Sequence, residues 1–244
     1  MKNSAERIWI IGSSSGIGAA VARAYAKTGA ELILSARNSD DLAEVAQDCG
    51  RARVIPLDLA DEKSLRDAIE RISENGPLDK IICTAALYKP KKVSELSHED
   101  AEAMVRVNLL GMIDIGRLCP PLLRDGGQLV LFGSVAGYVG LPAGQPYSAT
   151  KAGVNSLAES LAVELAPRVD VRLVSPGFVR TRLTDQNDFD MPAMIEPEEA
   201  ADALIRGLKK SGFEIHFPRR FTFAMKFLRI LPYPLMLRLT RRIG

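Results

Sequence analysis

The sequence predicts an α/β fold, a doubly wound parallel sheet of about seven strands with helices on both faces and a basic helical tail. Three observations favour it. Strand-like and helix-like segments alternate strictly from the start, the order typical of a parallel sheet. The strand segments are apolar throughout, as expected of strands buried on both faces. A glycine-rich run, IIGSSSGIGAA, joins the first strand segment to the first helix segment. In such a fold, ligands bind at the carboxyl ends of the strands.

The elements of the N-terminal half follow from the spacing of apolar residues. Arg7–Ile11 is a short apolar run before a glycine, which indicates a buried strand. Gly16–Thr28 carries apolar residues at helical spacing and stops at Gly29, a good helix terminator. Ser39 or Asp40 is expected to cap the second helix. The other elements expected here are a strand at 31–36, a helix at 39–49, a strand at 52–58, a helix at 61–73 and a strand at 80–86.

The C-terminal half continues the alternation. One long helix is expected over 99–122, ending near Pro120 and Pro121 because proline cannot continue a helix. The segment 181–194 is polar and irregular. The other elements expected here are a strand at 127–134, a helix at 147–166, a strand at 170–175, a helix at 198–208 and a strand at 213–217.

The composition is that of an ordinary soluble globular protein. Of 244 residues, 47% are hydrophobic and 25% are charged, and the net charge of +2 gives no general case for nucleic-acid binding. Cys49, Cys83 and Cys119 are scattered, so we expect buried thiols in a reducing compartment rather than a metal site or disulfides. Neither a signal peptide nor a membrane-spanning run is apparent, so a cytoplasmic location is expected.

The glycine-rich run is spaced G-x-x-x-G-x-G, which by itself is compatible with a flexible turn as well as a phosphate site. Its position between a strand and a helix favours the phosphate site, because a helix N-terminus presents free N–H groups and a positive dipole end. Glycine permits a sharp turn and a close approach of the backbone to a pyrophosphate, and serine hydroxyls add donors. The residues expected to hold the pyrophosphate are Gly12, Ser14, Ser15, Gly16, Ile17 and Gly18.

The end of the second strand bears on the choice of nicotinamide cofactor. It has Ala36 and Arg37 where an NAD-binding chain would usually carry Asp. An arginine there can bind the 2′-phosphate of NADP(H), so NADP(H) is the preferred cofactor and NAD(H) the alternative; a solvated arginine is the plainer interpretation. Asp58 either accepts a hydrogen bond from the adenine amino group or caps the next helix. Leu59 and Ala85 are expected to contact the cofactor as well.

A tyrosine–lysine pair predicts the chemistry. Tyr147 and Lys151 are four residues apart in an expected helix, so they share one face. An ammonium near a phenol favours the phenolate and lowers the tyrosine pKa, which makes the phenol a workable acid or base near neutral pH. Ser134 follows the fifth strand, at the sheet edge where a ligand is expected. Asn108 lies in the long helix before that strand, where a plain helix-face amide is the alternative interpretation.

Together these residues resemble the short-chain dehydrogenase/reductase family over about residues 5–216. The stretch GSSSGIG is similar to the family's TGxxxGIG loop, and Ser134, Tyr147 and Lys151 match its Ser and YxxxK signature. Asn108 in VRVNLLG matches the family's helix asparagine. The stretch SPGFVRT matches the segment that meets the nicotinamide end of the cofactor, through Pro176, Gly177, Val179 and Thr181. Five separated motifs in the family's order make the joint match specific.

The resemblance implies a reaction and a role for each residue. Tyr147 would protonate a carbonyl oxygen while nicotinamide C4 supplies hydride, and Ser134 would hydrogen-bond the same oxygen. Lys151 would hold the nicotinamide ribose and lower the pKa of Tyr147. Asn108 would position a water in the proton relay behind Lys151. No metal ligand is expected.

The chain departs from the family pattern in two places. Where the family commonly has Asn-Asn-Ala-Gly, this chain has Cys83, Thr84, Ala85 and Ala86. Ala86 in place of glycine would crowd the adenosine side, and the usual asparagine contacts are missing from the sequence. Ile11 replaces the usual threonine of the loop. Both departures bear on the fine geometry of cofactor binding and leave the reaction class unchanged.

The tail is basic, whereas many family members end in a glycine-rich segment. Residues 207–244 hold nine Lys or Arg and one Glu, a local charge of +8 that leaves −6 for the remainder. The spacing puts a polar and an apolar set on two helical faces: Arg219, Thr222, Lys226 and Arg229, against Phe221, Ala224, Met225 and Leu228. Three interpretations stay open: an anchor on anionic lipid, a helical flap that packs on the domain and walls a hydrophobic pocket, and a tail for protein partners.

We therefore expect residues 1–217 to form a single Rossmann-type NADP-binding and catalytic domain, and 218–244 a basic amphipathic helical extension. The expected function is an NADP(H)-dependent interconversion of a carbonyl and an alcohol on a small or lipophilic substrate, a 3-oxoacyl thioester being one candidate. A non-enzymatic NADP(H) sensor of the same fold is the alternative. The expected partners are a small-molecule substrate, further copies of the chain in a homodimer rather than a tetramer, and peripherally a membrane; nucleic acid is not expected.

Overall fold

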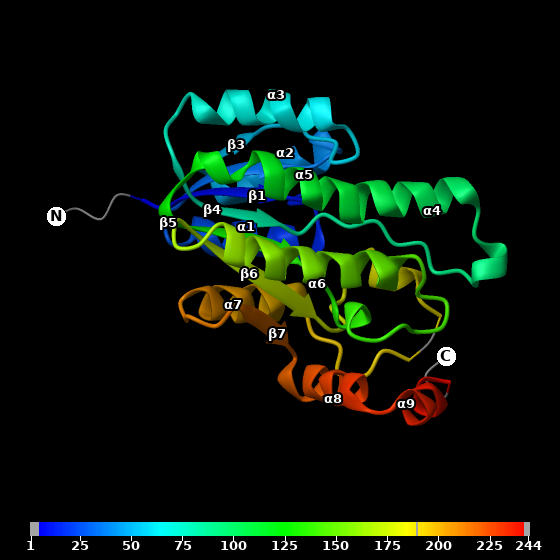
Figure 1. Cartoon of the computed structure of the whole chain (residues 1–244). Coiled ribbons are helices and arrows are strands. Elements are labelled where there is room, and N and C mark those ends of the chain that lie inside the picture. Colours follow the sequence, from blue (N-terminus) through cyan, green and yellow to red (C-terminus); the bar gives the residue numbers. More distant parts are fainter. Residues whose placement is uncertain (1–4, 189, 242–244) are drawn as a thin grey trace.

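A computed structural model of the chain describes residues 5–188 and 190–241. Its centre is one seven-stranded parallel sheet in the order β3-β2-β1-β4-β5-β6-β7 (Figure 1). The direction of strand addition reverses between β1 and β4, and at such a switch point a crevice opens beyond the carboxyl ends of the strands. The doubly wound prediction is confirmed. The strands are β1 (Arg7–Ile11), β2 (Glu31–Ser35), β3 (Ala52–Val54), β4 (Leu78–Cys83), β5 (Leu123–Phe132), β6 (Val169–Pro176) and β7 (Glu214–Phe217).

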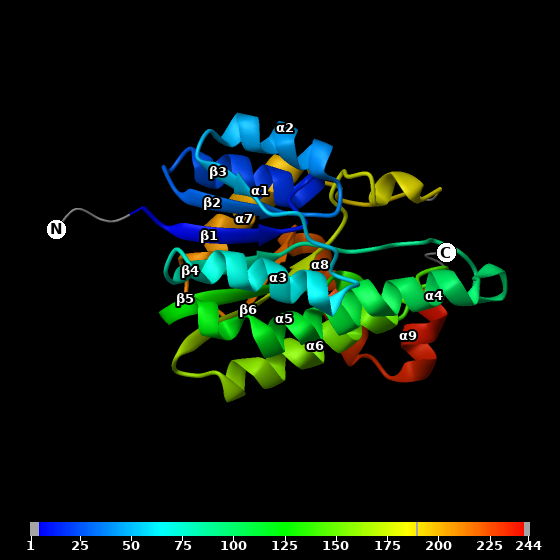
Figure 2. The same ribbon diagram turned by 90° about the horizontal axis from the view of Figure 1, so that it is seen from above.

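Helices cover both faces of the sheet (Figure 2). One face carries α1 (Gly16–Ala26), α2 (Ser39–Cys49) and α7 (Pro197–Leu208). The other carries α3 (Glu62–Ser73), α4 (His98–Val105), α5 (Gly111–Leu118) and α6 (Tyr147–Glu164). Short 3-10 turns are η1 (Val93–Glu95), η3 (Pro120–Leu122), η4 (Val135–Gly137) and η5 (Thr184–Gln186).

Strand β1 shows how the sequence divides the core. Its side chains alternate between the two faces, as the pleat requires, so Trp9 and Ile11 join one apolar cluster while Ile8 and Ile10 join the other. All four are buried, and burying one such side chain contributes about 1.5–3 kcal/mol. The indole N–H of Trp9 donates to Ser35 Oγ at 2.9 Å, so its polar atom is satisfied inside the core. The three cysteines are buried free thiols, as expected.

The long helix expected over 99–122 is interrupted, which corrects that prediction. It consists of α4, a π-helical turn η2 (Arg106–Leu110) and α5. The π turn carries Asn108, whose buried side chain bonds both backbone polar groups of Leu87. Such a turn re-aims a side chain at the cost of regular helix hydrogen bonding, and it occurs most often at functional sites.

Two smaller predictions were also wrong. The cap of α2 is neither Ser39 nor Asp40 but Asn38, which has extended backbone and accepts two N–H bonds of the first turn through Oδ1. The third strand is regular only over Ala52–Val54, although the N–H groups of Ile55 and Leu57 still donate to the β2-side carbonyls of Leu34 and Ala36 at 3.0 and 3.1 Å. The other strands and helices differ from expectation by a few residues at their ends.

The C-terminal helices are α8 (Arg219–Ile230) and α9 (Tyr233–Thr240), and α8 packs beside the β7 edge (Figure 1). The predicted face assignment of α8 was wrong in part. Thr222, expected on the polar face, is fully buried, and its hydroxyl lies 2.6 Å from His216 Nδ1. Lys226 turns to the domain and pairs with Glu214 of β7 at 2.5 Å.

Of the set expected on the apolar face of α8, Met225 is buried and Ala224 is exposed. Phe223 and Phe227, which were assigned to neither face, are exposed. The contacts of Thr222 with His216 and of Lys226 with Glu214 therefore determine which face of α8 turns toward the domain. Within residues 5–188 and 190–241, no helix has the length and apolar character needed to cross a membrane.

Candidate active site

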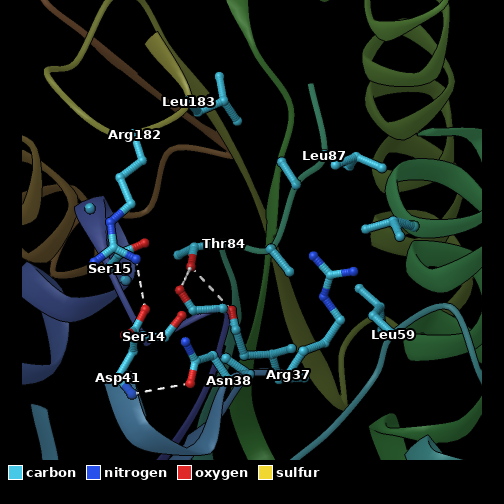
Figure 3. A pocket seen from close by; sticks show the side chains of 18 of the residues that line it. Ser14, Ser15, Arg37, Asn38, Asp41, Leu59, Thr84, Leu87, Arg182 and Leu183 are labelled. Atoms are coloured by element: carbon cyan, nitrogen blue, oxygen red, sulfur yellow. Dashed lines mark hydrogen bonds and ion pairs between the residues drawn. The ribbon is translucent and has the colours of Figure 1, made fainter. Parts of the chain in front are cut away.

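A cavity of about 620 Å³ opens at the carboxyl edge of the sheet, at the β1–β4 switch point (Figure 3). Its walls come from the loop after β1, the end of β2, the loops after β3 and β4, and the segment after β6. These loops contribute the cofactor-site residues Gly12, Ser14, Ser15, Gly16, Ile17, Gly18, Arg37, Asp58, Leu59, Ala85 and Thr181, all of which line the cavity. The structure thus brings together most of the residues that the sequence placed in one site.

The glycine loop is shaped to bring backbone close to a ligand. Gly12 has φ +87°, and a Cβ there would lie 2.5 Å from the Ala85 nitrogen. A Cβ on Gly18 would overlap the carbonyl oxygen of Gly12. Ser15 precedes α1 without a side-chain cap bond, and the first turn holds no acidic residue, so the helix N-terminus is open to an anion. This cradle fits the pyrophosphate of a dinucleotide.

The adenosine end of the cavity is basic. Arg37, after β2, makes no ion pair within residues 5–188 and 190–241 and lines the cavity from one side. Arg182 approaches from the other side, where its Nη1 lies 2.7 Å from Asp41 Oδ2 (Figure 3). Asp41 therefore neutralises Arg182, whereas Arg37 keeps an uncompensated charge. A free guanidinium at this place suits a phosphate group better than ribose hydroxyls.

The side chains of Asp58 and Thr84, which line the cavity, both make hydrogen bonds to nearby backbone groups. Asp58 Oδ1 accepts the Ala60 N–H at 2.9 Å, while the cap of α3 is Asp61. The Asp58 side chain thus braces its own turn at the cavity wall and is not the cap. Thr84, which stands where the family commonly has asparagine, donates to the carbonyls of Ile11 and Gly12 at 3.1 and 3.0 Å. Its hydroxyl ties the end of β4 to the glycine loop.

Tyr147 and Lys151 lie one turn apart at the start of α6, and Ser134 follows β5. Burial raises the pKa of Tyr147 well above its usual range, and a hydrogen bond with Ser134 opposes that shift. Lys151 is buried, donates to the Phe132 carbonyl at 2.7 Å and lies 5.6 Å from the centroid of the Tyr147 ring. Burial lowers the pKa of Lys151 to about 8.

The expected lowering of the Tyr147 pKa by Lys151 is not the net effect in this structure. Desolvation is the largest influence on the pKa of the phenol. The free energy lost by taking a phenolate out of water exceeds the stabilisation that the nearby groups give it. The ammonium is directed at the Phe132 carbonyl rather than the phenol oxygen. At neutral pH the phenol therefore carries its proton.

Asn108 is brought next to the site by the π turn. Its Oδ1 accepts the Leu87 N–H at 2.7 Å, and its Nδ2 donates to the Leu87 carbonyl at 2.7 Å and to Thr150 Oγ1 at 3.3 Å. The Asn108 side chain therefore links the loop after β4 to Thr150 of α6. Thr150 immediately precedes Lys151. A role in a water relay stays a prediction.

The segment after β6 reaches the cavity from the far side. Thr181 lies over the glycine loop, since a Cβ on Gly16 would be 2.9 Å from Thr181 Cγ2. Val179 is buried and pairs with Ile195. Pro176 ends β6, and a Cβ on Gly177 would be 2.8 Å from Phe221 Cδ1 of α8.

The family model described as short chain dehydrogenase matches residues 6–191. The chain belongs to this family. The resemblance inferred from the separated motifs is thereby confirmed.

Relatives and solved structures agree with this membership in the short-chain dehydrogenase family. An uncharacterized oxidoreductase of Staphylococcus epidermidis is 30% identical over 204 residues, covering 82% of this chain and 89% of the relative. One from Myxococcus xanthus is 28% identical over 242 residues, covering 96% of both. A short chain dehydrogenase from Burkholderia cenocepacia in complex with NADP superposes with a TM-score of 0.86 at 26% identity, covering 98% of this chain and 99% of that one. A short-chain dehydrogenase from Sphingobium yanoikuyae in complex with NADPH has a TM-score of 0.78 at 26% identity, covering 87% and 88%.

Several residues of this short-chain dehydrogenase were missed by sequence reasoning. Tyr88 packs edge-on against Tyr147, and its hydroxyl donates to Asn187 at 2.9 Å. Phe221 of α8 packs against Gly177 and lies 5.4 Å from the ring of Phe178. No short motif marks such residues, since they meet across long sequence separations. The other missed contributors to the cavity are Asn38, Asp41, Leu57, Leu87, Val107, Arg182 and Leu183.

Proposed function

We propose that this short-chain dehydrogenase is an NADP(H)-dependent oxidoreductase that interconverts a carbonyl and an alcohol on a small or lipophilic substrate. One observation carries the proposal. Tyr147 opens α6 and Ser134 follows β5, so both lie at the carboxyl edge of the sheet that also holds the glycine cradle, and Lys151 Nζ lies 5.6 Å from the centroid of the Tyr147 ring. An acid–base phenol at the same sheet edge as a pyrophosphate cradle is an arrangement that suits nicotinamide-dependent carbonyl chemistry.

Each residue of the site has a role in this proposal. The nicotinamide supplies or accepts the hydride when it is bound. Tyr147, protonated at neutral pH because burial raises its pKa, donates its proton to the carbonyl oxygen. Ser134 donates a hydrogen bond to the same oxygen, which stabilises the developing negative charge. Lys151 holds the ribose hydroxyls on the nicotinamide side through its ammonium.

NADP(H) is preferred over NAD(H) in this proposal because of the end of β2. Arg37 is free to bind a 2′-phosphate, while Ala36 offers no carboxylate for ribose hydroxyls. The Burkholderia and Sphingobium neighbours were crystallised with NADP and NADPH, which supports the same choice. The stretches LPAGQPY, which leads into Tyr147, and SPGFV, which follows β6, contain no charged side chain, which favours a lipophilic substrate.

The test is a screen of NADPH oxidation over lipophilic ketones, aldehydes and a 3-oxoacyl thioester, run in parallel with NADH. The wild-type chain is expected to turn over at least one carbonyl faster with NADPH. Tyr147→Phe is expected to lose that turnover by about a hundredfold or more while NADPH binding is retained. Tight NADPH binding without turnover of any carbonyl by the wild-type chain would instead support a cofactor sensor.

A further inference from the structure

The two C-terminal helices concentrate exposed apolar side chains. Ten large hydrophobic residues are exposed among those that the structure describes, and six of them lie on α8 and α9. Monomeric proteins rarely leave such side chains gathered without a partner. We call these six the tail surface: Phe223, Phe227, Ile230, Tyr233, Leu235 and Leu237.

On α8 the exposed apolar residues form one stripe. Phe223, Phe227 and Ile230 are spaced by four and three residues, so they stand above one another on the same helix face. Arg219 and Arg220 lie within the first turn and, by the same helical spacing, flank this stripe on either side. The stripe is 55% exposed at Phe223, 59% at Phe227 and 76% at Ile230. The helix therefore presents aromatic and aliphatic side chains with cations beside them.

The charge around the tail surface has one sign. Residues 218–241 contain six Lys or Arg and no Asp or Glu. Lys226 is neutralised by Glu214, but the five arginines are exposed and make no ion pair with any residue of the described ranges. These are Arg219, Arg220, Arg229, Arg238 and Arg241. A partner for this surface must offer apolar contact and negative charge together.

The opposite side of α8 is fixed to the domain. The Thr222 hydroxyl lies 2.6 Å from His216 Nδ1. Lys226 Nζ donates to Glu214 Oε2 at 2.5 Å. Phe221 packs on Gly177 beside the active site. The exposed stripe is therefore held in one orientation. This also makes α8 a buttress of the segment after β6, so whatever binds the stripe lies next to the cleft.

We propose that the tail surface docks on the headgroup region of an anionic lipid bilayer. Amphipathic helices rich in arginine, with Phe and Leu on the other side, bury their apolar face at the boundary of headgroups and acyl chains. Arginine side chains can extend to phosphate groups while their stems stay in the apolar layer. A second copy of the chain fits less well, because a two-fold contact through this surface would bring like-charged arginines together. The docking goes beyond the proposed reaction and does not depend on it.

The first test is co-sedimentation of the full chain with vesicles of phosphatidylcholine, with and without phosphatidylglycerol. The wild-type chain is expected to pellet with the anionic vesicles and to stay in solution with the neutral ones. Replacing Phe223 and Phe227 by Ser should weaken partitioning by about tenfold or more. Val163→Ser is the matched control, since Val163 is an 80% exposed apolar residue on α6, and it should pellet like the wild type.

The second test is charge reversal. Arg219→Glu with Arg220→Glu should weaken anionic partitioning by about thirtyfold or more, because each basic residue near an anionic surface contributes separately. Arg51→Glu with Arg206→Glu, on exposed sites away from the tail, is the control for net charge. NADPH binding and circular dichroism of each variant report folding independently of lipid.

Three outcomes would overturn the proposal: no pelleting of the wild-type chain with anionic vesicles, equal pelleting of the Phe variant, or equal pelleting of the Arg219/Arg220 variant. If light scattering shows an oligomer that the Phe223/Phe227 variant dissociates, the occupant is a second copy instead. The carbonyl screen addresses the reaction alone, so failure of either proposal leaves the other standing.

Discussion

Tyr88 stands edge-on to Tyr147, with ring centroids 4.9 Å apart and planes inclined at 63°. Such edge-to-face pairs are favourable beyond the area that they bury. The Tyr88 hydroxyl donates to Asn187, so this one residue joins the loop after β4 to the segment after β6 beside the Tyr147 phenol. Tyr88 therefore influences both access to Tyr147 and its desolvation.

Tyr88→Ala is expected to lower the pKa of Tyr147, because burial is the main cause that raises it and Tyr88 adds to the shift. In the proposed reaction Tyr147 acts in its protonated form, so the alkaline fall of kcat/KM for carbonyl reduction should move to lower pH. Tyr88→Phe keeps the ring and its burial of Tyr147 but loses the electrostatic influence of the hydroxyl and a bond of about 1 kcal/mol to Asn187, so its alkaline limb should move less than that of Tyr88→Ala. An unchanged alkaline limb in Tyr88→Ala would contradict this account.

Lys151 carries a stability cost that depends on pH. Its pKa in the folded chain is about 8, below the value near 10.4 of an unfolded lysine, so between these values the unfolded state binds more protons and stability rises with pH. Lys151→Met removes the buried charge. At pH 7 it should raise the free energy of unfolding by up to about 3 kcal/mol, less the lost bond to Phe132, and the gain should shrink from pH 8 to pH 10.

Urea unfolding of the wild-type chain and Lys151→Met across pH 7 to 10 measures this difference directly. Groups common to both chains cancel in the comparison. If the difference in free energy of unfolding between the two chains stays constant over that pH range, burial does not destabilise the charged form of Lys151. Activity is expected to be lost in the variant whatever its stability.

Much of the fold could be predicted because local pattern and burial agree. The apolar run of β1 and the glycine after it indicate a buried strand from sequence alone, and the structure buries it on both faces. Asn108 shows the limit: helical periodicity contains no signal for a π turn, or for the two hydrogen bonds that this turn lets the side chain make with Leu87. The face of α8 was missed for a similar reason, since Glu214 and His216 decide which side turns inward.

Part of the site could be predicted because a shared helix face or a glycine loop is local. Tyr147 and Lys151 are one turn apart, and the spacing alone pairs them. Tyr88 with Asn187, and Arg182 with Asp41, are 99 and 141 residues apart, and single-sequence patterns carry nothing about such meetings. The direction of the Tyr147 pKa also depends on burial, which the tyrosine–lysine spacing does not reveal.

Arg37→Gln is expected to weaken NADPH binding by about ten- to a hundredfold, because a charge-assisted bond to phosphate contributes about 1.5–3 kcal/mol. NADH lacks the 2′-phosphate, so its affinity should stay the same. Fluorescence titration with both cofactors measures the two constants. Arg51→Gln, an exposed arginine away from the cavity, is the control. Equal weakening for both cofactors would place Arg37 elsewhere than at the 2′-phosphate.

Gly18→Ala is expected to abolish the stabilisation of the folded chain against unfolding that bound NADPH gives. A Cβ at this position would overlap the Gly12 carbonyl oxygen and lie 2.6 Å from Thr84 Oγ1, so the glycine loop must move away from α1. In an unhindered helix the same change would stabilise by about 1 kcal/mol, so any loss comes from the clash. Gly140→Ala is the control, since nothing lies within 4 Å of its Cβ. In thermal unfolding at about 100 times the Kd, the wild type and Gly140→Ala should gain about 2.7 kcal/mol from NADPH. A comparable gain in Gly18→Ala would mean that the loop does not hold the pyrophosphate as its geometry indicates.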